Sequence, residues 1–421
     1  MSRKPLPFPK PARPAAASVL PVFFLLLAAL LLPAQAAFAK GSGPQLPQPG
    51  FRSVGLWDPD IPIRMDIAVW YPSPRIPRDL LLDGWSIRVG QNGITIPGRY
   101  PVILISHTTA ASRLASHDLA ATLARHGFIV IAPTHPKDNM DDTSGIFHAA
   151  LFADRPRQLL LALEAVEKNA ALHNIIDRSR IGILGVGAGA ATALQLAGAR
   201  PDPSLLGNHC ALPENAVSAD PLCSSWARLF HPQIQAEFAA LLANGPEKFT
   251  PVLYAKAEPL TGGSSLNDLS HALAQDNKTQ PAVPPQPPLP KTDTRQAQNV
   301  LAVGLLTPGL IDLFPDAVLQ NVAVPVGILA AGNDAVYPAA KSVDRLQLLL
   351  PQRPALRVLQ NAGHGDVQAP CPPMYQESFS ALCGGQNPSG EDWRKIRNDF
   401  FVRFFQKTLG PPGPPPLLPS Q

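Results

Sequence analysis

Residue types that could do chemistry together occur at three places along the chain. The first is the glycine-rich segment Gly185–Gly189, which follows the apolar run Ile181–Leu184 and precedes a run of small residues. The second and third are Asp334 and His364, each shortly after another apolar run. A carboxylate can orient an imidazole, which can then act as a general base. Side chains that can exchange a proton therefore follow two of the apolar runs, and a sharp turn from a strand into a helix follows a third.

The elements that must position these residues are expected from the hydrophobic pattern. Continuous apolar runs alternate with helical patterns, which is typical of a parallel sheet with helices on both faces. The expected strands are residues 102–105, 128–131, 181–184, 300–306, 326–331 and 356–359, and the expected helices are residues 114–125, 155–168, 190–199 and 393–409. Chemistry in such a sheet collects at the carboxyl ends of the strands.

The remaining regions differ from this alternation. Residues 51 to about 100 read as short antiparallel strands, because Ile63–Tyr71 alternates and Trp85–Val89 precedes an Asn92-Gly93 turn signal. We expect one discontinuous α/β core over 40–200 and 300–409, with a cap-like insertion over 201–299 that carries the proline tract Pro281–Pro290. Residues 410–421 are expected to be a disordered tail.

Composition and charge restrict the classes of partner. The chain has 421 residues, 45% hydrophobic and 16% charged, which is ample apolar material for a core. Its 50 prolines argue against a protein of long helices. The first 39 residues contain Arg3, Lys4, Lys10 and Arg13 and no acidic residue, so they carry the whole net charge of +4. A neutral remainder argues against a nucleic-acid partner.

The N-terminus is typical of a secretory signal peptide over residues 1–39. A basic stretch precedes the apolar run Val19–Leu32, and Ala37-Phe38-Ala39 fits a cleavage site. The alternative is an uncleaved membrane anchor over Val19–Ala39. We expect cleavage, which places the protein in the periplasm or outside the cell with no integral membrane association.

Export permits disulfides, and the four cysteines fall into two close pairs. Four cysteines allow three pairings. We expect the sequence-local pairing, Cys210 with Cys223 and Cys371 with Cys383.

The glycine-rich segment has two interpretations. Gly185, Gly187 and Ala190 satisfy the dinucleotide pattern G-x-G-x-x-A, but no second strand ending in an acidic residue follows. The other interpretation is a nucleophile elbow, G-x-S-x-G, a strained turn that lifts a side chain above the sheet. We favour the elbow, because the glycines follow the third strand of the alternation.

At this point the chain resembles a known family, the secreted bacterial α/β-hydrolases of the dienelactone-hydrolase-like type, which are similar to platelet-activating-factor acetylhydrolases. The resemblance covers most of residues 50–408. It rests on Leu104–Arg113, Gly127–Pro136, Asp177–Gly182, Gly332-Asn333-Asp334, Gly363-His364-Gly365, the paired cysteines and the helix with Phe400, Phe401, Phe404 and Phe405. It implies the α/β-hydrolase fold, the carboxylic-ester hydrolase class and no cofactor.

The sequence departs from the family pattern at the residues that matter most. Gly187 stands where the family has its serine nucleophile, and glycine has no side chain that could attack a carbonyl. The expected oxyanion region is His107, Thr108 and Ala188. The family usually has His-Gly in the first part of it, whereas this chain has His107-Thr108.

The rest of the triad is present, because the resemblance implies that Asp334 is the orienting acid and His364 the general base. We interpret His107 as a structural histidine. His135 precedes Asp138, Asp141 and Asp142, but their spacing matches no known metal site, so we expect a solvated loop and no metal.

The sequence therefore favours an exported α/β-hydrolase-fold protein that is catalytically impaired. We expect it to keep a pocket for a small ester-like or lipid-like ligand, and a protein partner is a further option. The alternative is an active ester or lactone hydrolase that uses His364 and Asp334 with a water or a displaced hydroxyl as nucleophile. The candidate hydroxyls are those of Ser106, Thr108, Thr109 and Ser112.

Overall fold

The computed structural model describes residues 46–60, 63–145, 151–202, 205, 300–378, 383 and 392–412. The expected signal peptide, the Cys210–Cys223 pair and nearly all of the expected insertion and tail lie outside these residues. No helix in the described residues is long and apolar enough to cross a membrane.

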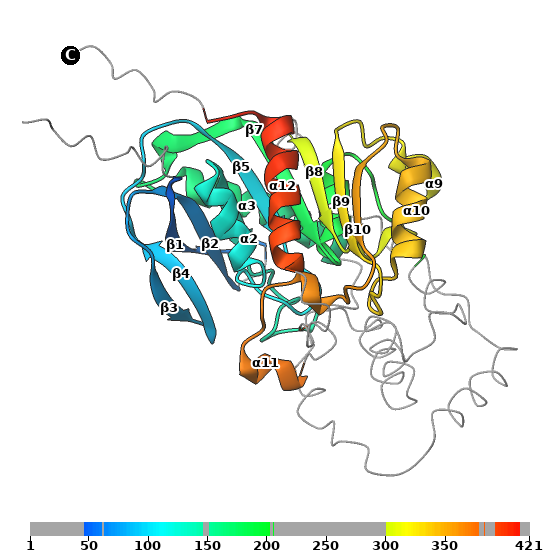
Figure 1. Ribbon diagram of the computed structural model, residues 1–421, viewed down its shortest axis with the longest axis horizontal. Coiled ribbons are helices and arrows are strands. Elements are labelled where there is room, and N and C mark those ends of the chain that lie inside the picture. The colour runs from blue at the N-terminus through cyan, green and yellow to red at the C-terminus, as the bar shows by residue number, and fades with distance from the viewer. Residues whose placement is uncertain are drawn as a thin grey trace, which may run out of the picture. The chain divides into compact units, whose positions relative to one another are not determined.

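The described chain forms a ten-stranded mixed sheet (Figure 1). The strands are β1 (Gln48–Trp57), β2 (Arg64–Ser73), β3 (Arg78–Leu82), β4 (Trp85–Gln91), β5 (Tyr100–Ser106), β6 (Ile129–Pro133), β7 (Ile176–Val186), β8 (Val300–Leu306), β9 (Val326–Ala331) and β10 (Ala355–Leu359). Their order across the sheet is β10-β9-β8-β7-β5-β6-β2-β1-β4-β3. Strands β5 to β10 are mutually parallel, as expected, while β2 runs antiparallel to both β6 and β1.

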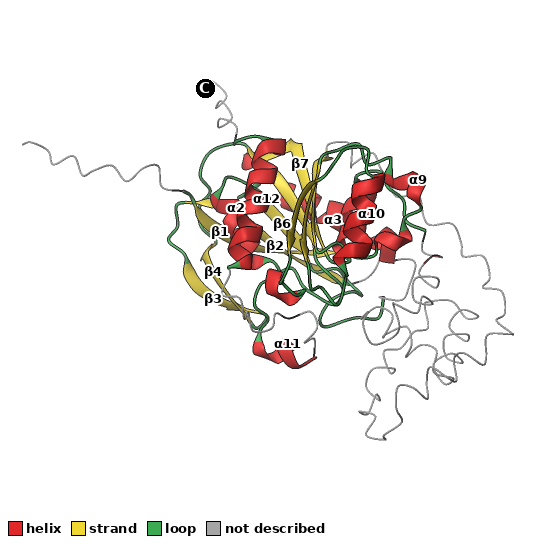
Figure 2. Ribbon diagram, turned by 45° about the vertical axis from the view of Figure 1, so that its right-hand side comes forward, coloured by secondary structure: helices red, strands yellow, loops and turns green. Residues whose placement is uncertain are grey.

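Helices cover both faces of the sheet (Figure 2). The helices are α2 (His117–Arg125), α3 (Leu151–Glu167), α4 (Gly189–Leu196), α9 (Asp316–Leu319), α10 (Ala339–Leu349), α11 (Pro373–Ser378) and α12 (Trp393–Leu409), with short 3-10 turns η1 (His173–Ile175), η6 (Ile311–Leu313) and η7 (Gly365–Val367). Helices α2 and α12 pack together on one face, and α3, α4 and α10 pack on the other. Burial on both faces explains why β5, β6 and β9 are apolar without alternation.

The C-terminal helix α12 has the bounds that the sequence predicts. Asp392 caps its start, because the side chain accepts a hydrogen bond of 2.9 Å from the Lys395 N–H. The helix ends before Gly410, which has a φ of +75°. Between these ends, Phe401 and Phe405 are fully buried against the sheet.

Two expectations for the N-terminal strands are wrong. The hairpin turn lies at Asp83-Gly84, between β3 and β4, where both residues have positive φ. Asn92-Gly93 ends β4 without starting a hairpin. Strand β2 does not alternate, because it lies inside the sheet and is covered on both faces from Ile67 onward.

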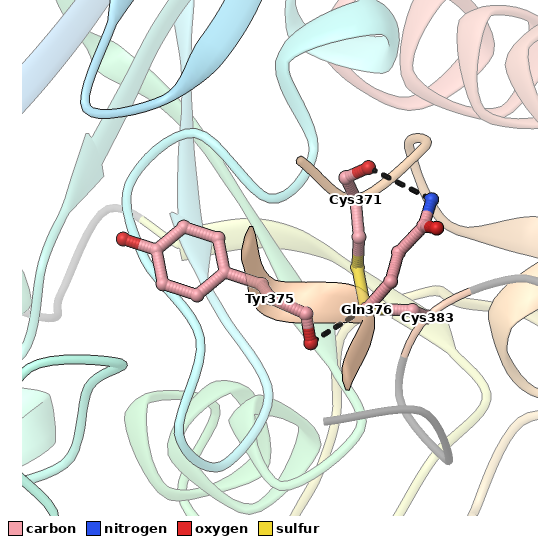
Figure 3. Close-up of a disulfide and its surroundings, with 4 residues drawn as sticks. All are labelled: Cys371, Tyr375, Gln376 and Cys383. Atoms are coloured by element: carbon pink, nitrogen blue, oxygen red, sulfur yellow. Dashed lines mark hydrogen bonds between the residues drawn. A yellow bond between two sulfur atoms is a disulfide. The ribbon is translucent and has the colours of Figure 1, made fainter. Parts of the chain in front are cut away.

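A disulfide joins Cys371 to Cys383, as the sequence-local pairing predicts (Figure 3). It closes a loop that follows the segment of His364 and contains α11. The backbone carbonyl of Cys371 accepts a 3.3 Å hydrogen bond from the Gln376 side chain within the same loop. The disulfide therefore restrains the segment that follows His364 at the carboxyl ends of the parallel strands.

Candidate functional site

The glycine-rich segment forms the turn from β7 into α4. Gly187 lies at its apex with φ +53°, in the left-handed region that disfavours a Cβ atom. Its N–H donates to the Leu306 carbonyl at 3.0 Å, and its own carbonyl accepts from Ala190 and Gly309 at 3.0 Å each. The turn thus keeps the sharp strand-to-helix geometry expected of a nucleophile elbow.

The flanking glycines have a packing role. A Cβ atom at Gly185 would lie 2.6 Å from the Cα atom of Ala190, and one at Gly189 would collide with the Ser106 carbonyl oxygen. The tight turn needs both glycines for steric reasons, so their presence does not require a bound dinucleotide.

The acid and the base expected from the sequence lie in contact. Asp334 follows β9 and His364 follows β10, and these strands are parallel neighbours with Ala331 opposite Leu359. Asp334 Oδ2 lies 2.9 Å from His364 Nδ1, and Asp334 Oδ1 accepts 2.8 Å hydrogen bonds from the Val336 and Tyr337 amides. The carboxylate is therefore fixed by three donors and orients the imidazole.

The other ring nitrogen of His364, Nε2, is buried, and it has no hydrogen-bond partner among the described residues. The ring of Tyr337 packs edge-on against the imidazole, with 5.6 Å between centroids. An imidazole held at Nδ1 by a carboxylate and vacant at Nε2 has the arrangement of a general base.

Thr108 occupies the space beside the elbow. Ser106 is opposite Gly185 in the parallel pair of β5 and β7, so Thr108 and Gly187 leave neighbouring strands at the same edge. A Cβ atom at Gly187 would lie 2.7 Å from the Thr108 Cβ and 3.0 Å from Tyr337 Cε2, and nearer still to the Thr108 hydroxyl. Thr108 is only 5% exposed, and its hydroxyl has no hydrogen-bond partner in the part of the chain that the structure describes.

Two backbone amides at this edge are available to an oxygen atom. Within the described chain, neither the Ala188 nor the Thr109 N–H donates to a backbone or side-chain acceptor. In α/β-hydrolases the oxyanion hole uses the amide after the nucleophile and one from the loop after an earlier strand. Ala188 directly follows Gly187, and Thr109 lies in the loop after β5, next to His107 and Thr108, which the sequence analysis assigned to the oxyanion region together with Ala188.

A buried arginine supports the loop that carries Thr108. Arg155 on α3 donates from Nη2 to the carbonyls of His107, at 2.7 Å, and Thr108, at 3.4 Å. Its Nε atom lies 3.3 Å from Asp138 Oδ2, and Asp138 Oδ1 accepts a 2.8 Å hydrogen bond from the Ala110 amide. Desolvation lowers the pKa of Arg155, although Asp138 opposes this effect. Arg155 thus binds the start of the segment 107–110 at the His107 carbonyl, and Asp138 binds its end at the Ala110 amide.

A second buried network lies under the same loop. The Ser106 hydroxyl is 3.0 Å from His135 Nε2, and His135 Nδ1 is 2.9 Å from Gln158 Oε1. The amide of His135 donates to His107 Nε2 at 3.0 Å. These contacts fix both imidazoles as neutral rings, with Ser106 donating to His135.

Burial makes protonation of these histidines unfavourable. Desolvation, assisted by Arg155, lowers the pKa of His107 to about 3 and that of His135 well below its ordinary value. The expectation that His135 and Asp138 lie in a solvated loop is wrong, because both are fully buried. In the described residues no group of His, Cys, Asp or Glu side chains has a geometry that could hold a metal ion.

Two other candidate hydroxyls, those of Ser106 and Ser112, form hydrogen bonds, unlike the hydroxyl of Thr108 within the described residues. Ser106 is fully buried and bonded to His135, and the Ser112 hydroxyl accepts a 3.2 Å hydrogen bond from the Leu114 amide. The sequence analysis did not single out Tyr337, Arg155 or Gln158. Of these three residues, only Tyr337 could have been suspected from the sequence, because it lies three residues after Asp334.

Comparisons with known proteins support this reading of the site's fold. Residues 86–174 match the family model of platelet-activating factor acetylhydrolase, isoform II. A ferulic acid esterase from Streptomyces cinnamoneus matches with a TM-score of 0.50 at 16% sequence identity, covering 91% of this chain and 95% of that chain. The chain is an α/β-hydrolase-fold protein. No relative is found among curated proteins.

The matched segment defines what the family relationship covers. It includes β5, β6, all of α3 and the loop with His107 and Thr108, and it ends before Gly187. The match therefore includes the loop with His107 and Thr108 and leaves out Gly187, Asp334 and His364. The elbow, Asp334 and His364 are placed by the geometry alone.

Proposed function

We propose that this chain is an exported protein of the carboxylic-ester hydrolase class that has lost its elbow nucleophile and keeps a site for an ester-like or lipid-like ligand. The observation that carries the proposal is Gly187 at the apex of the turn, with the Thr108 side chain filling the adjacent space. A glycine can form no acyl-enzyme. Loss of the nucleophile costs about 10⁶ in turnover in other hydrolases.

The ligand class follows from the groups that remain around the elbow. The Ala188 and Thr109 amides are donors suited to a carbonyl oxygen, and His364 Nε2 can exchange a hydrogen bond with an ester or hydroxyl oxygen. The segment 86–174 matches a family named for an acetylhydrolase, and one of the similar solved structures is a ferulic acid esterase. An uncharged or weakly charged ester fits this set of neutral donors.

A second candidate function is slow hydrolysis by a different nucleophile. The specific observation in its favour is the hydrogen bond between Asp334 and His364, with Nε2 vacant. A water activated by His364, or the displaced hydroxyl of Thr108, would then attack the ester. Oxyanion donors and binding alone can retain roughly 10³–10⁴ of acceleration over water, so slow hydrolysis by itself does not show an evolved enzyme.

Calorimetric titration with phenyl butyrate tests the binding proposal. We expect saturable binding by the mature protein, weakened about fivefold to tenfold in His364→Ala through loss of one hydrogen bond. Leu348→Ala is the matched control, because Leu348 is an exposed residue of α10. Absence of binding to phenyl esters of any chain length from acetate to octanoate would contradict the proposal.

A further inference from the structure

We infer that Thr108 is the residue that keeps the elbow closed, and that the site around it is latent, so that exchanging Thr108 and Gly187 together restores acyl transfer. The inference rests on the proposed loss of the nucleophile at position 187. It adds that a second residue, on a different strand, maintains that loss.

The first step is steric exclusion. A Cβ atom at position 187 would lie 2.7 Å from the Thr108 Cβ and closer to its hydroxyl, and such a separation is not found between real Cβ atoms. Tyr337 Cε2 would be 3.0 Å away, a contact that a shift of a few tenths of an ångström relieves. Thr108 is therefore the residue that excludes a side chain at position 187, whereas Tyr337 could accommodate one by a small shift.

The second step is that Thr108 cannot move aside. Its carbonyl accepts hydrogen bonds from three donors: His107 Nδ1 at 2.7 Å, Arg155 Nη2 at 3.4 Å and the Ala111 amide at 3.3 Å. The loop continues directly into Ala110, whose amide is held by Asp138 at 2.8 Å. A side chain introduced at position 187 alone would have to displace this whole clamped segment.

The third step is that the other parts of an acyl-transfer site are in place. Gly187 keeps the left-handed conformation of an elbow apex, Asp334 holds His364, and His364 Nε2 is vacant. The Ala188 and Thr109 amides have no other acceptor within the described residues. Only the nucleophile and the room for it are missing.

The chemistry that the double exchange restores is ordinary acyl transfer. A serine hydroxyl at position 187 gives its proton to His364 Nε2 while its oxygen bonds to the ester carbonyl carbon. The bond from that carbon to the alcohol oxygen then breaks, and the leaving alkoxide takes the proton from His364. Water repeats both steps on the acyl-enzyme and releases the acid, so the hydroxyl is regenerated.

Four variants of the mature protein test the inference against p-nitrophenyl butyrate. Neither single variant, Thr108→Gly or Gly187→Ser, is expected to gain activity over the rate of the natural protein, the second because of the collision. Thr108→Gly/Gly187→Ser is expected to exceed that rate by about 10²-fold or more, a fraction of the 10⁶ that a nucleophile contributes. Thr108→Ala/Gly187→Ser is the matched control, because alanine keeps the Cβ atom at 2.7 Å, and it is expected to stay low.

Further readouts identify the mechanism. The gain is expected to disappear when His364→Ala is added, and a fluorophosphonate probe is expected to label position 187 in the double variant only. A double variant that folds and remains at the natural rate overturns the inference. Equal gains with Thr108→Gly and Thr108→Ala, or in Gly187→Ser alone, overturn it as well.

A stability cycle tests the coupling without relying on activity. Gly187→Ala introduces the same Cβ atom, and its backbone strain is the same whatever residue occupies position 108. We expect Gly187→Ala to lower the midpoint of thermal unfolding by several degrees more in the natural background than in Thr108→Gly. Equal shifts in both backgrounds overturn the inference even if the double variant is unsuitable for assay. High turnover by the natural protein would instead refute the proposed function while leaving this coupling measurable.

Discussion

The side chain of Thr108 occupies the space that a side chain at position 187 would need. The two residues belong to different strands of the parallel sheet, and each lies two residues beyond the paired positions Ser106 and Gly185. Gly187 has the left-handed backbone conformation, and the space beside it is filled. The site thus combines the hydrogen-bonded pair Asp334 and His364 with a turn apex that has no room for a side chain. This combination gives the following predictions.

Asp334 is expected to contribute to stability as well as to orientation. Asp334→Ala leaves the buried amides of Val336 and Tyr337 and the Nδ1 atom of His364 without a partner. We expect a loss of about 3–5 kcal/mol in the free energy of unfolding, measured with urea. Asp334→Asn is expected to lose less, because its carbonyl oxygen can still accept from the two amides. Asp344→Ala, at an exposed position on α10, is the control, and a loss as small as its own would contradict this prediction.

The neutral histidines His107 and His135 are expected to make the protein sensitive to acid. In the folded protein the pKa of each histidine lies below the ordinary value of 6.5, and that of His107 is about 3. At a pH between the folded and the unfolded pKa, the unfolded chain therefore binds more protons than the folded protein. Their contribution is therefore complete above pH 6.5 and is lost as the pH falls toward the folded pKa. Each histidine gives a slope of about 1.4 kcal/mol per pH unit. A free energy of unfolding that stays constant between pH 7.5 and 5 would refute this expectation.

Arg397 is expected to anchor the segment after His364. This fully buried residue of α12 donates to the Val367 carbonyl and to Asp118, each at 2.6 Å. Burial raises the pKa of Asp118, but the Arg397 guanidinium outweighs it and the pKa lies below its ordinary value. We expect Arg397→Met to cost about 3–5 kcal/mol, because it leaves a partly buried carboxylate and a carbonyl unpaired.

The matched control for Arg397 lies on the same helix. Lys395 forms an exposed ion pair with Asp399, and Lys395→Met is expected to change stability by about 0.5 kcal/mol or less. Amide exchange in the 3-10 turn Gly365–Val367 is expected to accelerate in Arg397→Met and not in Lys395→Met. Equal exchange in both variants would show that Arg397 does not hold this turn.

The Cys371–Cys383 disulfide is expected to stabilise the loop over 371–383. The bridge closes a loop with a sequence separation of 12 residues, and chain entropy gives about 3 kcal/mol for a loop of that size. Thermal unfolding of Cys371→Ser/Cys383→Ser under oxidising conditions measures the contribution. A midpoint equal to that of the natural protein would mean that the loop is ordered without the bridge.

Much of the fold could be predicted because burial dictates the sequence pattern. The runs that became β6, β8 and β9 were recognisable, since strands covered on both faces are apolar throughout. Helix α12 was predicted from its aromatic-rich pattern, and the structure shows Asp392 capping its start and Gly410 following its end. The hairpin at Asp83-Gly84 was missed, since Asn92-Gly93 is an equally strong local signal and only pairing with β1 decides between them.

The positions of the main site residues could be predicted from the sequence, but the contacts around them could not. Gly187, Asp334 and His364 each follow a recognisable strand, so their convergence could be expected from a parallel sheet. The contact between Thr108 and Gly187 could not, because it depends on the register of β5 against β7 and on the backbone path of the loop after β5. Arg155 and Gln158 are polar residues inside a helix, and nothing local tells that they point into the interior.

The most direct test of the central claim is the hydrolysis of short-chain p-nitrophenyl esters by the mature natural protein, with His364→Ala measured beside it. Because Gly187 offers no nucleophile and Thr108 fills its place, the account predicts that both proteins stay close to the rate in buffer. Rapid turnover by the natural protein that disappears in His364→Ala would contradict it, and would mean that another group has replaced the missing side chain.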